Sequence, residues 1–175
     1  MLQLILLRHA KTERSSPNGD HGRKLTDRGE RDAALIGKHL RERGLVPDLA
    51  LVSDSERTRQ TFDIVTAQFD RTIEQHLDPE LYLADSATLL KAAMKTPPPA
   101  ERIMIIAHNP GMGELAHSLA TLSGSPDTID HFPTAALAVF AFDAPEWIDL
   151  NAAKAHLAYF TTPKLLRPDS DDGDD

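Results

Sequence analysis

The sequence has 175 residues, no cysteine and a formal net charge of −8, and 41% of its residues are hydrophobic. This length favours one domain with a full hydrophobic core, and the lack of cysteine excludes disulfides, thiolate metal sites and cysteine nucleophiles. The acidic charge argues against a general nucleic-acid binder, and no apolar run reaches the roughly 18 residues of a membrane span. Residues 1–7 also lack the positively charged n-region of a signal peptide. We therefore expect a cytoplasmic protein, with no membrane partner, that acts as a monomer.

The chain is expected to divide into one folded domain, residues 1–167, and an acidic tail, residues 168–175. The tail contains five aspartates and no side chain suited to packing against a core. Segments of this composition bury too little apolar surface to offset the entropy lost on ordering. We expect a solvated, disordered end.

The first part of the chain predicts a strand, a loop and a helix. Residues 2–7 form a continuous apolar run, which is typical of a strand buried on both faces. Residues 12–24 are polar and contain the run Ser-Ser-Pro-Asn-Gly, which favours a loop. Thr26 is the expected N-cap of a helix that ends at Gly44, with apolar residues at helical spacing between them.

The middle of the chain predicts a second strand and two further helices. Residues 49–52 form the strand, which ends at Ser53, and Asp54 or Ser55 can cap the helix that follows. Apolar residues mark the inner positions of this helix (Phe62, Val65 and Phe69) and of the next one (Leu89, Leu90 and Met94). The second of these helices is expected to end before the three prolines at positions 97–99.

The last part of the chain predicts a third buried strand over residues 102–107 and a helix over residues 111–122. Residues 135–142 indicate a strand near an edge of the sheet, and residues 157–160 its antiparallel partner. Strands that alternate with helices indicate an α/β domain with a mostly parallel central sheet.

Histidine and arginine follow the expected strands at comparable positions. Arg8 and His9 follow the first strand, a short segment leads from the second strand to Arg57, and His108 follows the third. Ligands of open α/β sheets bind just beyond the carboxyl ends of the strands, so these side chains converge if the strands are neighbours. Guanidinium groups bind phosphoryl oxygens through paired donors, and neutral imidazole is a competent nucleophile near neutral pH. The sequence therefore predicts a phosphoryl-transfer site.

Four segments resemble, in order, the signatures of the histidine phosphatase superfamily, which includes cofactor-dependent phosphoglycerate mutases and acid phosphatases. Residues 7–12 (LRHAKT) resemble its "RHG" signature, and residues 25–33 (LTDRGERDA) resemble "LTxxGxxQA". Residues 52–61 (VSDSERTRQT) resemble "VSSPxxRAxQT", and residues 107–111 (AHNPG) resemble "GHNPG". The short chain and the last segment are most similar to the SixA-type phosphohistidine phosphatases, compact members that lack inserted lid segments.

This resemblance implies a fold and a set of roles. The fold would be phosphoglycerate mutase-like, a three-layer α/β/α arrangement with a mostly parallel central sheet and an antiparallel edge. His9 would attack phosphorus and become phosphohistidine, while Arg8 and Arg57 would bind the phosphoryl oxygens. His108 would add a further donor or positive charge to the same oxygens.

Other candidate site residues rest on weaker signals. Glu80 lies between Arg57 and His108 where mutase-like relatives carry a glutamate, so it is the candidate general acid, although a loop glutamate is usually just solvated. Thr12 and Ser15 could donate a hydroxyl to phosphate or could equally cap the loop, and Asn109 is a third candidate for substrate binding. Ala10 departs from the usual glycine of the family, which removes access to unusual backbone angles. Asp20 and His21, in the first loop, could also contact substrate.

We expect no cofactor and no metal, because the histidines lack a compact ligand spacing such as His-x-x-x-His on a helix. The leading function is removal of phosphate from phosphohistidine in a signalling protein. A phosphatase for small metabolites, such as sugar phosphates or nucleotides, is the first alternative, and a non-catalytic phosphate-binding module is a second. A mutase would need a lid to keep its phosphorylated intermediate from water, and little of this sequence could form one.

Overall fold

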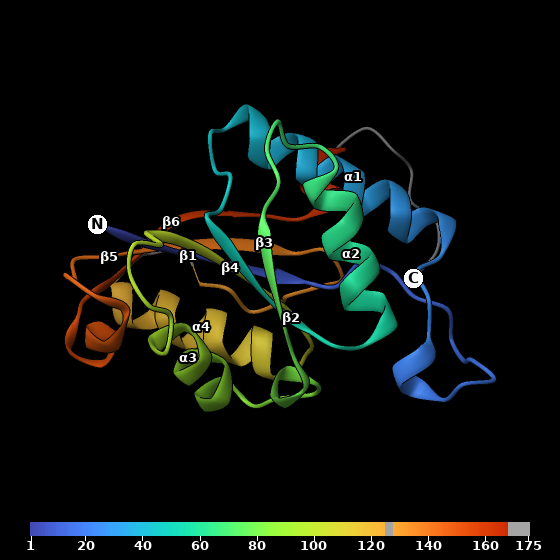
Figure 1. Ribbon diagram of the computed structural model, residues 1–175. Helices are drawn as coiled ribbons and strands as arrows, with labels where there is room; N and C mark the ends of the chain where they lie inside the picture. Colours follow the sequence, from blue (N-terminus) through green and yellow to red (C-terminus); the bar gives the residue numbers. More distant parts are fainter. Residues whose placement is uncertain (125–127, 168–175) are drawn as a thin grey trace.

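The computed structural model describes residues 1–124 and 128–167 (Figure 1). The acidic tail expected over residues 168–175 lies outside the described residues. In the described part, no helix is both long and apolar enough to cross a membrane.

A mixed β-sheet forms the centre of the fold, with its described strands in the order β3-β2-β4-β1-β5-β6. Strands β1, β2, β3 and β4 run parallel to one another, whereas β5 is antiparallel to β1 and β6 is antiparallel to β5. The prediction of a mostly parallel sheet with an antiparallel edge is confirmed. The strand bounds are β1 (Leu2–Arg8), β2 (Leu49–Ser53), β3 (Glu74–Asp78), β4 (Arg102–Ala107), β5 (Leu137–Phe142) and β6 (Ala155–Thr161).

Helices cover both faces of this sheet and give the predicted three-layer arrangement (Figure 1). Helices α1 (Asp27–Glu42) and α2 (Glu56–Thr66) pack on one face, and α3 (Ser86–Met94) and α4 (Gly111–Ser123) pack on the other. The short helix α5 (Pro163–Leu166) lies against α1. Single 3₁₀ turns occur at 20–22 and 79–81, and a longer one at 147–152.

The central strands send alternate side chains into two separate cores. In β1, Leu4 and Leu6 belong to the core under α3 and α4, while Ile5 and Leu7 belong to the core under α1 and α2. In β4, the same alternation places Ile103 and Ile105 on one side and Met104 and Ile106 on the other, and all eight side chains are fully buried. Because both faces are covered, these strands are apolar at successive positions, which is the pattern that the sequence shows.

Two elements differ from the sequence-based expectation. Strand β3 was not predicted, because its residues Glu-Gln-His-Leu-Asp carry no apolar alternation and it lies at the exposed outer edge of the sheet. Helix α2 ends at Thr66, so Phe69 is buried just beyond the helix rather than within it. Both differences arise where tertiary contacts, not local pattern, determine the structure.

The start of α1 shows why a glycine stands in its first turn. Thr26 caps the helix as predicted, since its side-chain oxygen accepts a hydrogen bond from the backbone N–H of Gly29 (3.1 Å). A Cβ atom at Gly29 would overlap the carbonyl oxygen of Lys11. Lys11 lies two residues after His9, so this close approach helps to fix the loop that follows β1.

We expect Gly29→Ala to lower the free energy of unfolding by about 1–3 kcal/mol, because the added methyl group meets backbone rather than a flexible side chain. Urea denaturation of the two proteins measures this difference. Arg31→Ala, at an exposed position of the same helix, is the matched control and should change stability by less than about 0.5 kcal/mol. Equal stability of Gly29→Ala and the wild type would contradict the close contact.

Candidate active site

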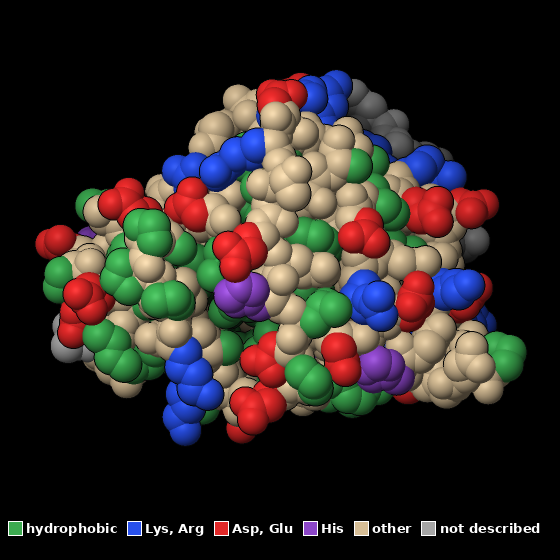
Figure 2. Space-filling view, viewed as in Figure 1, with side chains coloured by type: hydrophobic (Ala, Val, Ile, Leu, Met, Phe, Trp, Pro, Cys, Tyr) green, Lys and Arg blue, Asp and Glu red, His purple; other side chains and the backbone are tan. Residues whose placement is uncertain are grey.

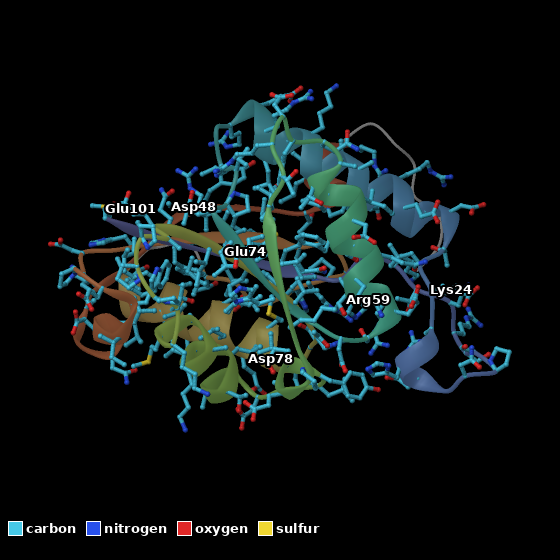
Figure 3. The ribbon with its side chains drawn as sticks, in the orientation of Figure 1. Lys24, Asp48, Arg59, Glu74, Asp78 and Glu101 are labelled. Atoms are coloured by element: carbon cyan, nitrogen blue, oxygen red, sulfur yellow. The ribbon has the colours of Figure 1, made fainter. Side chains whose placement is uncertain are left out.

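A pocket of about 700 Å³ opens at the carboxyl ends of the central strands. His9 follows β1, His108 follows β4, and Arg57 lies in the first turn of α2, directly after β2. Because β4 lies between β1 and β2 in the sheet, the three segments meet there, at the end of the molecule where Figure 3 labels Lys24 and Arg59. Arg8, His9, Arg57 and His108 all line this pocket. The structure therefore brings together the four residues that the sequence singled out.

His9 is held by its backbone and by one ring nitrogen. Its N–H donates to the carbonyl of Ala107 (3.2 Å), and its own carbonyl accepts from the N–H of Ala135 (3.0 Å). Its Nδ1 lies 2.9 Å from the carbonyl oxygen of Ala10, and since a carbonyl only accepts, Nδ1 carries the proton. The lone pair of the neutral ring is therefore on Nε2.

Burial, followed by repulsion from nearby arginines that include Arg8 and Arg57, lowers the pKa of His9 to about 3, although the bond to Ala10 acts in the opposite direction. The ring is thus uncharged at neutral pH, which is the form that can act as a nucleophile. Ala10 itself is fully buried, donates its N–H to Thr61 Oγ1 (3.1 Å) and does not need a left-handed backbone. The alanine in place of the family's usual glycine is therefore accommodated without strain.

Arg8 and Arg57 each present a buried donor without a partner. Arg57 Nη1 donates to the backbone carbonyl of Asp20 (2.7 Å), Arg57 Nη2 donates to the Asp20 carboxylate (3.1 Å), and Arg8 Nη1 donates to the carbonyl of Phe132 (3.2 Å). The Nε–H of each arginine is buried and has no acceptor. Burial, together with the charge of Arg57, lowers the pKa of Arg8. An anion placed against both Nε–H groups would satisfy them and relieve this repulsion.

His108 has both ring nitrogens engaged by protein groups. Arg57 Nη2 lies 3.2 Å from Nδ1, and since a guanidinium only donates, Nδ1 accepts and Nε2 carries the proton. Nε2 donates to Ser53 Oγ (2.7 Å). Burial, then the nearby His9 and arginines, lower the pKa of His108 to about 3. His108 is therefore neutral in this arrangement and accepts from Arg57, while its expected contact with phosphoryl oxygens stays a prediction.

The weaker candidates divide into two groups. Thr12 and Asn109 line the pocket, but Thr12 Oγ1 accepts from Arg23, and the Asn109 amide bonds the carbonyl of Phe132 (2.8 Å) and the N–H of Gly113 (3.1 Å). Ser15 and Glu80 are exposed and lie outside the set of residues that line the pocket. Glu80 belongs to the 3₁₀ turn at 79–81, so its position between two site residues in the sequence did not bring it to them in space.

The structure adds two residues to the site that the sequence did not single out, Ser53 and Tyr82, and it gives Asp20 a definite partner. Ser53 bonds His108, Asp20 bonds Arg57, and Tyr82 donates its hydroxyl to the Asp20 carboxylate. The pKa of Asp20 lies well below its usual range because of the bond from Tyr82 and then the bonds and charges of Arg23 and Arg57. The sequence placed Asp20 in a loop that could reach substrate, but it gave no indication that this carboxylate would contact an arginine instead. Among residues 1–124 and 128–167, no group of three or more histidine, aspartate or glutamate side chains is arranged to hold a metal ion.

Comparison with known proteins agrees with this geometry. Residues 4–82 match a sequence model of the histidine phosphatase superfamily (branch 1). A solved protein from Nakamurella multipartitia, assigned as the phosphohistidine phosphatase SixA, aligns with a TM-score of 0.80 and 28% identity over 93% of this chain and 96% of that chain. The chain belongs to the histidine phosphatase superfamily.

Two further relatives of this histidine phosphatase extend the comparison. A solved protein from Agrobacterium tumefaciens, also assigned as SixA, aligns with a TM-score of 0.72 and 28% identity over 93% of this chain and 99% of that chain. An uncharacterised protein of Mycobacterium tuberculosis is 29% identical over 163 residues, which cover 90% of this chain and all of the relative. The chain is a histidine-type phosphatase with a phosphoglycerate mutase-like fold.

We expect the ring resonances of His9 and His108 to remain those of neutral imidazole from about pH 8 down to about pH 5, because the pKa of each ring is near 3. In the urea-unfolded chain the same rings should gain a proton near pH 6.5. Between about pH 3 and pH 6.5, each ring therefore binds a proton in the unfolded state but not in the folded state. As a result, the free energy of unfolding of the protein falls as the pH drops below about 6.5. Titration of the ¹⁵N ring shifts measures this directly.

The control for this titration is the pair of single variants His9→Gln and His108→Gln, which assign the two resonances. Protonation of either ring in the folded protein above about pH 6 would contradict the electrostatic description of the pocket.

Proposed function

We propose that this enzyme removes phosphate from phosphohistidine in a cytoplasmic signalling protein, acts as a monomer, and works through a phosphohistidine intermediate on His9. The observation that carries the mechanism is the neutral His9 ring, with its lone pair on Nε2, in the same pocket as two buried arginine Nε–H groups that have no acceptor. A nucleophile and two charge-assisted donors are what phosphoryl transfer needs from a protein.

In the first step, His9 Nε2 attacks phosphorus and the bond from phosphorus to the leaving imidazole breaks. The electron pair of that bond stays on the leaving nitrogen, which takes its proton from water. The Nε–H groups of Arg8 and Arg57 donate to phosphoryl oxygens as charge spreads over them. Each hydrogen bond of this charged kind contributes about 1.5–3 kcal/mol.

In the second step, water attacks the phosphohistidine, and the bond between phosphorus and His9 Nε2 breaks. One proton of the water is released, inorganic phosphate leaves, and the ring returns to its neutral form. The bond from His9 Nδ1–H to the Ala10 carbonyl holds the same ring orientation in both steps. The Ala10 carbonyl, which accepts from Nδ1–H, also stabilises the positive charge that the ring carries while it is phosphorylated.

The choice of phosphohistidine rests on the carboxyl groups around the pocket. Of the residues lining the pocket, the two with a carboxyl group are Glu13 and Asp20. Asp20 is held as the carboxylate by Tyr82, Arg23 and Arg57, so it is a poor proton donor, and the earlier candidate acid, Glu80, lies outside the pocket. An alkoxide leaving group needs a proton donor, whereas the P–N bond of phosphohistidine breaks with much less help.

The pocket entrance supports an anionic substrate larger than a phosphoryl group. Lys11, Arg14 and Arg28 line the pocket in addition to the arginines already described, in a chain of formal net charge −8. Cations gathered at one mouth of an acidic protein attract anionic partners and speed their encounter. Small phosphorylated metabolites fit the same description, so a metabolite phosphatase is the alternative function.

Phosphate release from a matched panel tests this proposal. The panel contains a phosphohistidine protein domain, a phosphoserine peptide, two sugar phosphates and a nucleotide, each with wild type and His9→Ala. We expect the highest kcat/KM with phosphohistidine, and a loss on the order of 10³-fold or more in His9→Ala because the nucleophile is removed. Circular dichroism checks that the variant is folded.

The outcomes of the panel separate the alternatives. Preference for a sugar phosphate or the nucleotide, still dependent on His9, would keep the mechanism and replace the substrate. No release by folded wild type, with retained phosphate binding in His9→Ala, would favour a non-catalytic binding module.

We expect Glu80→Gln to change kcat/KM by less than about twofold with every substrate, because the side chain lies outside the pocket. With a series of aryl and alkyl phosphates, the rate should fall steeply as the leaving group becomes more basic, since Asp20 is held as the carboxylate and Glu80 lies outside the pocket. The slope of log(kcat/KM) against leaving-group pKa measures this. A flat slope in the wild type that becomes steep in Glu80→Gln would restore Glu80 as the general acid.

A further inference from the structure

Asp20 occupies an unusual position for a carboxylate, because it binds an arginine of the phosphate pocket. It lies in the 3₁₀ turn at 20–22, within the loop that lines the pocket. Its carboxylate accepts from Arg57 Nη2 (3.1 Å), from Arg23 Nη1 (2.9 Å) and from the Tyr82 hydroxyl. The next residue, His21, contacts Asp54 (2.9 Å) and so anchors the same turn to the segment before α2.

This contact determines which part of the Arg57 guanidinium faces a ligand. Nη1 is taken by the backbone carbonyl of Asp20 (2.7 Å), and Nη2 is shared by the Asp20 carboxylate and His108 Nδ1 (3.2 Å). Two of the five N–H donors of the guanidinium remain: Nε–H, which is buried and has no acceptor, and the second N–H of Nη1. The contact with Asp20 therefore leaves these two donors for a phosphoryl group.

Tyr82 contacts the same oxygen of the Asp20 carboxylate as Arg57 does. Its hydroxyl donates to Asp20, and its ring lies edge-on to the His108 ring (5.4 Å between centroids). The Arg57 guanidinium carbon is 5.8 Å from the centre of the Tyr82 ring. Asp20 is thus fixed by groups from the first loop, from α2 and from the segment after β3, which makes its position well determined.

The same carboxylate opposes anion binding. It lines the pocket with a negative charge, and it partly neutralises the charge of Arg57. Two anions near each other repel, so the carboxylate lowers the affinity of the pocket for inorganic phosphate. A phosphatase whose product is phosphate turns over faster when the product is held less tightly.

We propose that Asp20 is a positioning residue of this phosphatase: it holds Arg57 in its reacting orientation, and its charge prevents the pocket from retaining the phosphate product. The proposal rests on the assignment of Arg57 to the phosphoryl group, but it does not depend on which phosphorylated substrate is the natural one.

The test is Asp20→Asn, which removes the charge and keeps an oxygen of the same size. We expect kcat to fall about tenfold, because a weaker bond to a neutral amide oxygen replaces the charge-assisted bond that orients Arg57. We also expect inorganic phosphate and tungstate to bind about fivefold more tightly by isothermal calorimetry, because the competing charge is gone. An aryl phosphate with a good leaving group serves as the substrate, so the result does not depend on phosphohistidine preference.

The opposite directions of the two changes distinguish positioning from simple structural support. A merely structural role for Asp20 would weaken anion binding and turnover together, and that result would overturn the proposal. So would an Asp20→Asn variant with both quantities within twofold of the wild type. Isothermal calorimetry of phosphate and tungstate binding distinguishes these results even if Asp20→Asn has no measurable turnover.

Three further variants sharpen the comparison. Asp63→Asn removes an equal charge from the exposed face of α2 and should change neither quantity. Glu13→Gln removes a charge from the same pocket without touching Arg57; if it reproduces both effects of Asp20→Asn, general pocket charge explains them and the positioning role is wrong. Tyr82→Phe should lower kcat by a smaller factor than Asp20→Asn, because Arg23 and Arg57 still hold the carboxylate.

Discussion

The site depends on two buried guanidinium donors that the protein leaves without acceptors beside a histidine that stays neutral. An unsatisfied buried donor costs about 1–3 kcal/mol, and more when it is charged. The Nε–H groups of Arg8 and Arg57 are in this state, so the hydrogen-bond network around the pocket is incomplete, and in the proposed mechanism a phosphoryl group would complete it. Burial, aided by the two positive charges, also keeps protons off His9 and thereby preserves its lone pair at neutral pH. The arginines thus contribute both to the binding of an anion and to the neutral state of the nucleophile.

The rest of the fold keeps these groups in place. Strand β4 lies between β1 and β2 with fully buried side chains on both faces, so the strand ends that carry the histidines are rigid. Short contacts between buried residues then fix the individual groups: Ala10 N–H to Thr61 Oγ1, and His108 Nε2 to Ser53 Oγ. Figure 2 shows acidic side chains spread over the viewed face, and in Figure 3 Asp48 and Glu101, at the amino ends of β2 and β4, lie at the opposite end of these strands from the pocket. The strongly acidic chain therefore still offers a cationic entrance.

The sequence predicted what regular structure determines and failed where loops determine it. Arg8, His9 and His108 follow apolar strands that the pattern of residues identifies, so their convergence follows from the parallel sheet alone. Arg57 was found in the same way, since it begins the helix after β2. Glu80 was misplaced and Tyr82 was missed because both lie in the irregular segment after β3, whose path depends on tertiary contacts. Strand β3 itself was missed for a related reason: an exposed edge strand needs no apolar alternation, and this one has none.

The hydrogen-bond directions determine where the proton of the second histidine lies. Arg57 can only donate, so His108 must accept at Nδ1, and the proton is then fixed on Nε2 against Ser53. A positive charge on His108 would require a proton on Nδ1, where it would face the Arg57 guanidinium. Such a charge becomes favourable only once an anion separates the two groups. The Asp20 carboxylate compensates the positive charge of Arg57, whereas the charge of Arg8 faces only a neutral carbonyl. In the proposed mechanism the net positive charge of the pocket is therefore smaller than the negative charge of a phosphoryl dianion. This difference favours release of the phosphate product.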